Sequence, residues 1–114
     1  MAEESGSTGE RIVIYSRASR MDIASIHLYN ASRYGEEHAD RFVEELTNAI
    51  EEILETPLVG RPVAQRPGIR IMVFKSTRRR SAHGYQVFWK SVARGIEVVR
   101  ILHTAMDAGL HLPE

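Results

Sequence analysis

Arg70, Tyr85, Arg100 and His103 are side chains of this chain whose types could together perform acid–base chemistry on a phosphodiester. Cleavage of RNA through its 2′-hydroxyl requires a base for that hydroxyl, an acid for the leaving oxygen and cations around the phosphorane. An imidazole, a phenol and two guanidiniums supply these types. On a regular strand Arg100 and His103 point to opposite faces, because side chains alternate. A joint role therefore requires a bend or a strand end near Leu102.

The same residues also have purely structural interpretations. His103 could bond to backbone at the edge of a sheet, which is how many buried or half-buried polar side chains are satisfied. The two arginines could each form an ion pair with an acidic side chain, the candidates being Asp22, Glu97 and Asp107. Both interpretations stay open at the level of sequence.

Three consecutive arginines, Arg78, Arg79 and Arg80, form the densest positive charge in the chain. On an extended loop they point outward, and unpaired guanidiniums favour an anionic partner. The alternatives are a solvated hairpin tip and a surface for an acidic patch of another protein. The neighbouring aromatic residues are not interleaved with these cations, which favours packing of their rings in the core over a platform on which nucleic-acid bases stack. No direct nucleic-acid partner is therefore expected.

Several kinds of chemistry lack the residues that they need. The chain has no cysteine, which excludes a disulfide framework, a thiolate metal site and a cysteine nucleophile. His27, His38 and His111 show no metal-ligand spacing with carboxylates, so we predict no metal. Neither a phosphate-cradling glycine motif nor a nucleophile elbow occurs, so we predict no cofactor.

Length and composition indicate one globular domain that functions in the cytoplasm. The 114 residues, 43% of them hydrophobic, suit a single core. No apolar run approaches the roughly 18 residues that span a bilayer, so no membrane association is expected. Residues 1–10 are polar and lack an apolar signal region, and we predict a disordered leader. The net charge is zero, but residues 1–55 carry −7 and residues 56–114 carry +7. This separation has two interpretations, a solvated acidic helix pair beside a basic sheet or a basic face that attracts an acidic partner.

Periodicity predicts the elements that would position these side chains. Residues 11–15 are β-branched and aromatic, which predicts a strand. A helix should begin at the N-cap Ser16 and end at Gly35. A second helix over about 36–55, ended by Pro57, carries one apolar stripe, formed by Ala39, Phe42, Val43, Leu46, Ala49, Ile50, Ile53 and Leu54. The short connection between the helices predicts an antiparallel hairpin.

The rest of the chain predicts strands. Residues 57–68 contain three prolines and two glycines and should form a loop. Strands are expected at 69–75, 83–90 and 95–103, joined as an antiparallel meander. The predicted order is β-α-α-β-β-β, an α+β domain over 11–107 with a helical hairpin packed on one face of a small, mostly antiparallel sheet, followed by a tail at 108–114.

Four segments with this order resemble the ParE branch of the RelE/ParE toxin superfamily. The last segment, IEVVRILHTAMD, is the most specific because Arg100, Ile101, Leu102 and His103 precede Met106 and Asp107. The other three are the start of the first helix with Ala18, Asp22, Ile23, Ile26 and Tyr29, the second helix and its exit from Gly35 to Gly60 and Arg61, and the strands with Gly68, Ile69, Arg70, His83, Gly84, Tyr85, Val87, Phe88 and Trp89.

The resemblance implies the toxin of a type II toxin–antitoxin system. A ParD-like antitoxin with an acidic C-terminal segment would hold it inactive, and DNA gyrase would be its target. The residues expected to contact partners are Arg70, Arg78, Arg79, Arg80, Arg100, His103 and Asp107. RelE-type members are instead ribosome-dependent mRNA endonucleases, but the basic and aromatic cluster of RelE-type C-termini is missing after His103. A third alternative is a non-toxic interaction module on the same fold. The triple arginine departs from the usual family pattern and leaves the role of its loop open.

Overall fold

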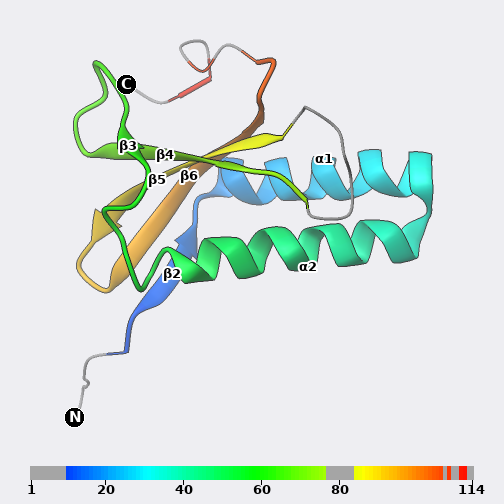
Figure 1. Cartoon of the computed structure of the whole chain (residues 1–114), viewed down its shortest axis with the longest axis horizontal. Helices are drawn as coiled ribbons and strands as arrows, with labels where there is room; N and C mark the ends of the chain where they lie inside the picture. The colour runs from blue at the N-terminus through cyan, green and yellow to red at the C-terminus, as the bar shows by residue number, and fades with distance from the viewer. Residues whose placement is uncertain (1–9, 77–83, 107, 109–110, 113–114) are drawn as a thin grey trace.

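The computed structural model describes residues 10–76, 84–106, 108 and 111–112. The predicted leader, Arg78–Arg80 and Asp107 therefore lie outside the described residues, apart from Glu10. Figure 1 shows the elements in the predicted order, with one addition. They are β2 (Ile12–Tyr15), α1 (Arg17–Tyr34), α2 (Glu36–Glu52), β3 (Arg61–Pro62), β4 (Ile69–Phe74), β5 (Tyr85–Val92) and β6 (Gly95–His103).

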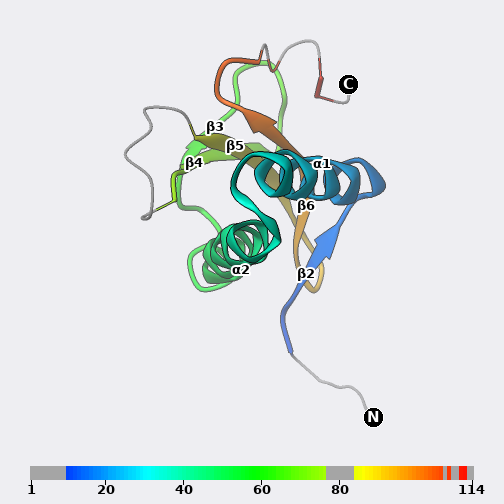
Figure 2. The same ribbon diagram turned by 90° about the vertical axis from the view of Figure 1, so that its right-hand side faces the viewer.

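The sheet has the order β2-β6-β5-β4-β3. Only β2, which pairs with β6, is parallel to its neighbour, so the expected mostly antiparallel sheet is confirmed. In Figure 1 the two helices run side by side in opposite directions, and Figure 2 shows them end-on against the sheet. The addition is β3, which pairs with β4 inside the segment predicted to be a loop. A two-residue strand containing a proline leaves no pattern that periodicity could detect.

The helix boundaries follow from local hydrogen bonds. The Ser16 hydroxyl accepts the backbone N–H of Ser19 at 3.0 Å, as predicted for an N-cap. Gly35, with a φ of +96°, ends α1 and donates its N–H to the carbonyl of Ala31. The second helix ends at Glu52, three residues before the predicted end, because bonds between residues three apart tighten the chain over the next turn. No helix in the described ranges is long and apolar enough to cross a membrane.

The main core lies between the helices and the sheet. The predicted stripe of α2 supplies Ala39, Phe42, Leu46 and Ile50, all of them buried, which confirms the period of the stripe. The opposing sheet face supplies buried side chains of three strands, which are Phe74, Val87, Trp89, Ile96, Val98 and Ile101. Burial of a side chain of this size stabilises the fold by roughly 1.5–3 kcal/mol. This layer therefore accounts for most of the apolar burial.

A second, smaller core covers the other face of the sheet. Ile69, Ile71, Phe88, Val99 and Leu102 point away from the helices and pack together. Leu112, near the C-terminus, is buried against them, with Ala108 and Val63 beside it. The strands are apolar at nearly every position because both faces are covered.

The edge of β6 is closed by the start of α1 instead of by a strand. The pairing of β2 with β6 stops at Tyr15, opposite Val98. Just beyond, the Ser16 hydroxyl donates to the carbonyl of Val99 at 2.9 Å, and the Asp22 carboxylate accepts the N–H of Ile101 at 2.9 Å. Backbone groups that a longer β2 would have paired are thus satisfied by two side chains of α1 and its cap. This closure fixes α1 against the last third of β6.

Gly60 connects the loop after α2 to β3 and has little space around its α-carbon. Its φ is +79°, and an added Cβ would lie 2.3 Å from the carbonyl oxygen of Ile71. Gly68 has a similar φ of +86°, but an added Cβ there would meet nothing within 4 Å. A comparison of Gly60 with Gly68 therefore separates the effect of backbone strain from the effect of a clash with β4.

Replacement of these two glycines by alanine should destabilise the protein unequally. Gly68→Ala adds only the left-handed backbone strain, about 1–2 kcal/mol. Gly60→Ala adds the clash with the Ile71 carbonyl as well, and the loss should reach about 2–4 kcal/mol. Urea denaturation of both variants measures the difference. Equal losses would show that the approach of Gly60 to β4 does not constrain the fold.

Candidate functional site

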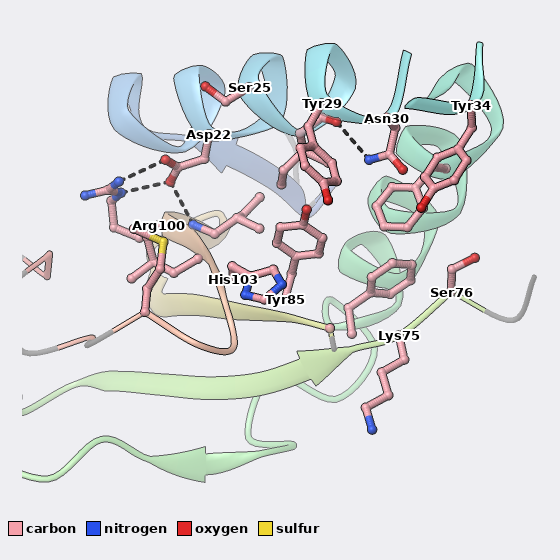
Figure 3. A pocket seen from close by; sticks show the side chains of 17 residues that line it. Asp22, Ser25, Tyr29, Asn30, Tyr34, Lys75, Ser76, Tyr85, Arg100 and His103 are labelled. Carbon is pink, nitrogen blue, oxygen red and sulfur yellow. Dashed lines mark hydrogen bonds and ion pairs between the residues drawn. The ribbon is translucent and has the colours of Figure 1, made fainter. Parts of the chain in front are cut away.

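A groove of about 590 Å³ opens between α1 and the ends of the three long strands. Figure 3 shows it from close by, with α1 along one side and the strand ends along the other. One side is formed by Asp22, Ser25, Ile26, Tyr29, Asn30 and Tyr34 of α1, and the rest by Phe42, Phe74, Lys75, Ser76, Gly84, Tyr85, Met106 and the end of β6 from Arg100 to His103. The groove is therefore built from segments far apart in sequence.

Five of the 17 residues that line the groove are tyrosines or phenylalanines. The ring of Phe42 meets Phe74 and Tyr85 edge-on, with centroids 5.7 and 5.9 Å apart. At the rim, Tyr29 and Tyr34 remain 49% and 43% exposed. Half-exposed aromatic residues around a hollow are typical of a binding surface, because a partner that covers them removes their apolar surface from water.

Tyr85 and Tyr29 lie on opposite sides of the groove, and Figure 3 shows their phenol groups pointing toward one another. Burial, and to a smaller extent the charge of Tyr29, raises the pKa of Tyr85 above its ordinary value of 10. Tyr85 is therefore a neutral hydrogen-bonding phenol at physiological pH. It cannot act as a ready general base there.

Arg100 is held by two structural partners at one end of the groove. Its Nε and Nη2 donate to the two carboxylate oxygens of Asp22 at 2.8 and 2.9 Å, and its Nη1 donates to the carbonyl of His111 at 2.9 Å. The hydrogen bond to Asp22 raises the pKa of Arg100. Of the three predicted acidic partners, Asp22 forms the pair. Arg100 thus links α1 to the C-terminal segment, and its charge is already neutralised.

His103 ends β6 and also lies against the groove. Its ring meets Tyr85 edge-on at 5.6 Å, and its Nδ1 accepts the backbone N–H of Ala105 at 3.1 Å. The structural interpretation predicted this kind of bond to backbone at the end of a strand. Both Arg100 and His103 line the groove, because the groove lies at the end of β6 and takes in all four residues from Arg100 to His103.

Arg70 lies outside the groove. Its guanidinium donates to the carbonyls of Leu58, Val59 and Gly60 at 2.6, 3.1 and 3.2 Å. Within the part of the chain that the structure describes, the partners of Arg70 are backbone oxygens and not an acidic side chain. Within the described residues, the four candidates do not form one acid–base set, because Arg70 is remote from the groove and Arg100 is neutralised. The arrangement is suited to binding.

Parts of this groove were not anticipated from sequence. Tyr34 was given no role, and Tyr29 and Met106 were named only within the segments that resemble the ParE branch. A signal did exist, because apolar side chains occur around the whole circumference of α1 and include the exposed Met21 and Leu28. A surface helix with one covered face normally carries polar residues on the other.

Among the described residues, one group of histidine and carboxylate side chains could hold a metal ion. His27 of α1 faces Glu36 and Asp40 of α2, and their potential ligand atoms lie within 4.8 Å of one another. Linear spacing did not reveal this group because it joins two helices. A 2.8 Å contact between His27 Nε2 and Asp40 already gives both side chains a partner. The group shares no residue with the groove.

The protein is thus a small two-layer α+β domain with a groove at the ends of its long strands. The family model of the ParE toxin of the type II toxin–antitoxin system parDE matches residues 13–108. The chain belongs to this ParE toxin family, as its sequence segments indicated.

Individual relatives agree with this assignment. The chain is 33% identical over 97 residues to toxin ParE1 of Caulobacter vibrioides, covering 85% of this chain and 93% of the relative. It is 30% identical over 101 residues to toxin ParE1 of Mycobacterium tuberculosis, covering 87% and 95%. A chain from the solved chromosomal ParDE system of P. aeruginosa has the same fold, with a TM-score of 0.67 at 18% identity, covering 81% of this chain and 94% of that one.

Removal of the Asp22 carboxylate should destabilise the protein and loosen α1. Asp22→Asn leaves the part-buried Arg100 charge unpaired, and the loss should be about 1–3 kcal/mol. The amide of Ile101 should also exchange faster in hydrogen-exchange measurements. A matched control is Glu37→Gln, which breaks an exposed pair with Arg41 and should change the stability by less than about 0.5 kcal/mol. Equal effects of the two variants would contradict the structural role of Asp22.

Proposed function

We propose that a ParD-like antitoxin neutralises this toxin by occupying the aromatic groove, and that the free toxin inhibits DNA gyrase through protein–protein contacts. The observation that carries the first part is the half-exposed aromatic rim of the groove, formed by Tyr29 and Tyr34. The second part rests on membership of the ParE family. The matching ParDE system of P. aeruginosa supports the pairing of toxin and antitoxin.

The chemistry of the groove favours a protein segment with an apolar face and acidic residues. Tyrosine, phenylalanine and methionine, which supply six of the 17 lining residues, are enriched in protein interfaces. Lys75 lies exposed at one end of the groove and has no ion pair in the described part of the chain. An amphipathic helix or extended segment could bury its apolar side chains against the rings and place a carboxylate at Lys75.

The same geometry gives less support to the alternative, an mRNA endonuclease of the RelE type. A transition state with developing negative charge needs cations that are free to meet it. Arg100 is neutralised by Asp22, and Arg70 is bonded to backbone carbonyls at another part of the sheet. Tyr85 and His103 meet edge-on within the groove, but without a free arginine among these candidates they do not complete the set.

Tyr29→Ala should weaken the binding of the antitoxin by about 10–100-fold, because aromatic residues at the centre of an interface contribute at this scale. Isothermal titration calorimetry with a ParD-like antitoxin measures the change. Leu28→Ala is the matched control, since Leu28 directly precedes Tyr29 in α1, is 70% exposed and does not line the groove. We expect less than about a threefold effect there. Similar losses for the two variants would place the antitoxin elsewhere.

The target is tested with purified DNA gyrase. Wild-type protein should inhibit supercoiling in a concentration-dependent manner, and prior addition of the antitoxin should restore it. The matched control is the preformed complex of toxin and antitoxin at the same concentration. Unchanged supercoiling at excess toxin, together with cleavage of ribosome-bound mRNA, would replace gyrase inhibition by the endonuclease alternative.

A further inference from the structure

Residues 57–60, here called the docking loop, have all four backbone carbonyls bonded by two side chains of the sheet. Trp89 Nε1 donates to the first carbonyl at 3.1 Å. Arg70 Nε donates to the carbonyl of Val59 at 3.1 Å, and Arg70 Nη2 donates to the carbonyls of Leu58 and Gly60 at 2.6 and 3.2 Å. The carbonyl oxygens belong, in order, to Pro57, Leu58, Val59 and Gly60.

The two donors are themselves fixed. Arg70 and Trp89 are direct cross-strand partners on β4 and β5, and Trp89 is fully buried in the main core. The guanidinium is a planar fork, so it holds three successive carbonyls in one orientation. Gly60 adds a close approach to β4 that no other residue type fits. A surface loop of this composition is normally one of the more mobile parts of a domain. Here its backbone is tied to the core.

The fixed backbone directs apolar side chains into solvent. Leu58 is 72% exposed and Val59 is 41% exposed. Such exposure contributes little to folding, because these side chains remain largely in contact with water. A rigid apolar side chain does favour association, since little conformational freedom is lost when a partner covers it. The ordering of this loop is therefore better explained by binding than by the stability of the domain.

The surroundings of the docking loop define the chemistry of its partner. Glu55 precedes the docking loop by two residues, but residues 56–68 contain no acidic side chain and carry Arg61 and Arg66. A shallow hollow of about 250 Å³ adjoins the loop and is lined by Gly60, Arg61, Ile71, Met72 and Val73. A complementary surface would present an apolar pocket for Leu58 with carboxylates around it.

We propose that the docking loop inserts Leu58 into an apolar pocket with an acidic rim on the protein that the toxin inhibits. This inference rests on the proposed function and adds the surface that meets the target. The docking loop shares no residue with the groove proposed for the antitoxin. Arg70 lies near the start of β4 and Phe74, which lines the groove, at its end, so one strand connects the two surfaces. Figure 1 shows β4 running between the α2–β3 connection and the groove side of the molecule.

Leu58→Asp tests the proposal directly. It should raise the concentration needed for half-inhibition of gyrase supercoiling at least about tenfold, and growth arrest on expression should weaken in parallel. The affinity for the antitoxin, measured by calorimetry, should stay within about threefold of wild type, because the groove is untouched. The control is Leu28→Asp, which places the same charge at an equally exposed leucine outside both surfaces and should leave inhibition unchanged.

A second variant tests the role of the rigid backbone. Arg70→Met keeps Leu58 but removes the donors to three carbonyls, so inhibition should weaken while amide exchange in residues 57–60 becomes faster. Full inhibition by Leu58→Asp would overturn the proposal, as would a loss of antitoxin affinity equal to the loss of inhibition. Failure of the proposed function is seen separately, because the wild-type protein itself would then not inhibit gyrase.

Discussion

The unpaired edge of β6 is the constraint on which the binding surfaces of this toxin depend. Because β2 pairs only as far as Val98, the backbone beyond it would face water or a neighbouring chain. Ser16 and Asp22 satisfy that backbone from α1, and the Asp22 carboxylate at the same time pairs with Arg100. The helix is therefore anchored to the strand along its first turns, while its later turns stand away from the strand ends. The aromatic groove occupies the space that this arrangement leaves.

The two arginines that the sequence offered for catalysis, Arg70 and Arg100, instead make structural contacts. Arg100 joins α1, β6 and the C-terminal segment through Asp22 and the carbonyl of His111. Arg70 holds the connection between α2 and β3 through three carbonyls. Each guanidinium has several donors in a fixed plane, so it can tie together segments that share no regular hydrogen bonding. The surfaces that we propose for recognition instead use tyrosines at the groove and Leu58 on the docking loop.

This division gives a physical account of how one small scaffold can meet two proteins. A domain of 114 residues has little surface to spare, and two partners that share one surface would exclude each other. Here the groove uses the end of β4 at Phe74, and the docking loop uses its start at Arg70. An antitoxin seated in the groove would act either by extending over the sheet to the other surface or by blocking the approach of a large target. Both routes follow from the short distance that a six-residue strand spans.

The sequence by itself determined the elements whose signals are periodic or local. The stripe from Ala39 to Ile50, the Ser16 cap and the Gly35 stop all appeared as predicted, because they depend on residues three or four positions apart. Asp22 was among the predicted partners of Arg100, although charge alone did not distinguish it from Glu97. Only the tertiary structure revealed the groove, the burial of Leu112 and the carbonyl contacts of Arg70. These depend on segments brought together by sheet pairing and on backbone oxygens, which every residue carries and no sequence pattern marks.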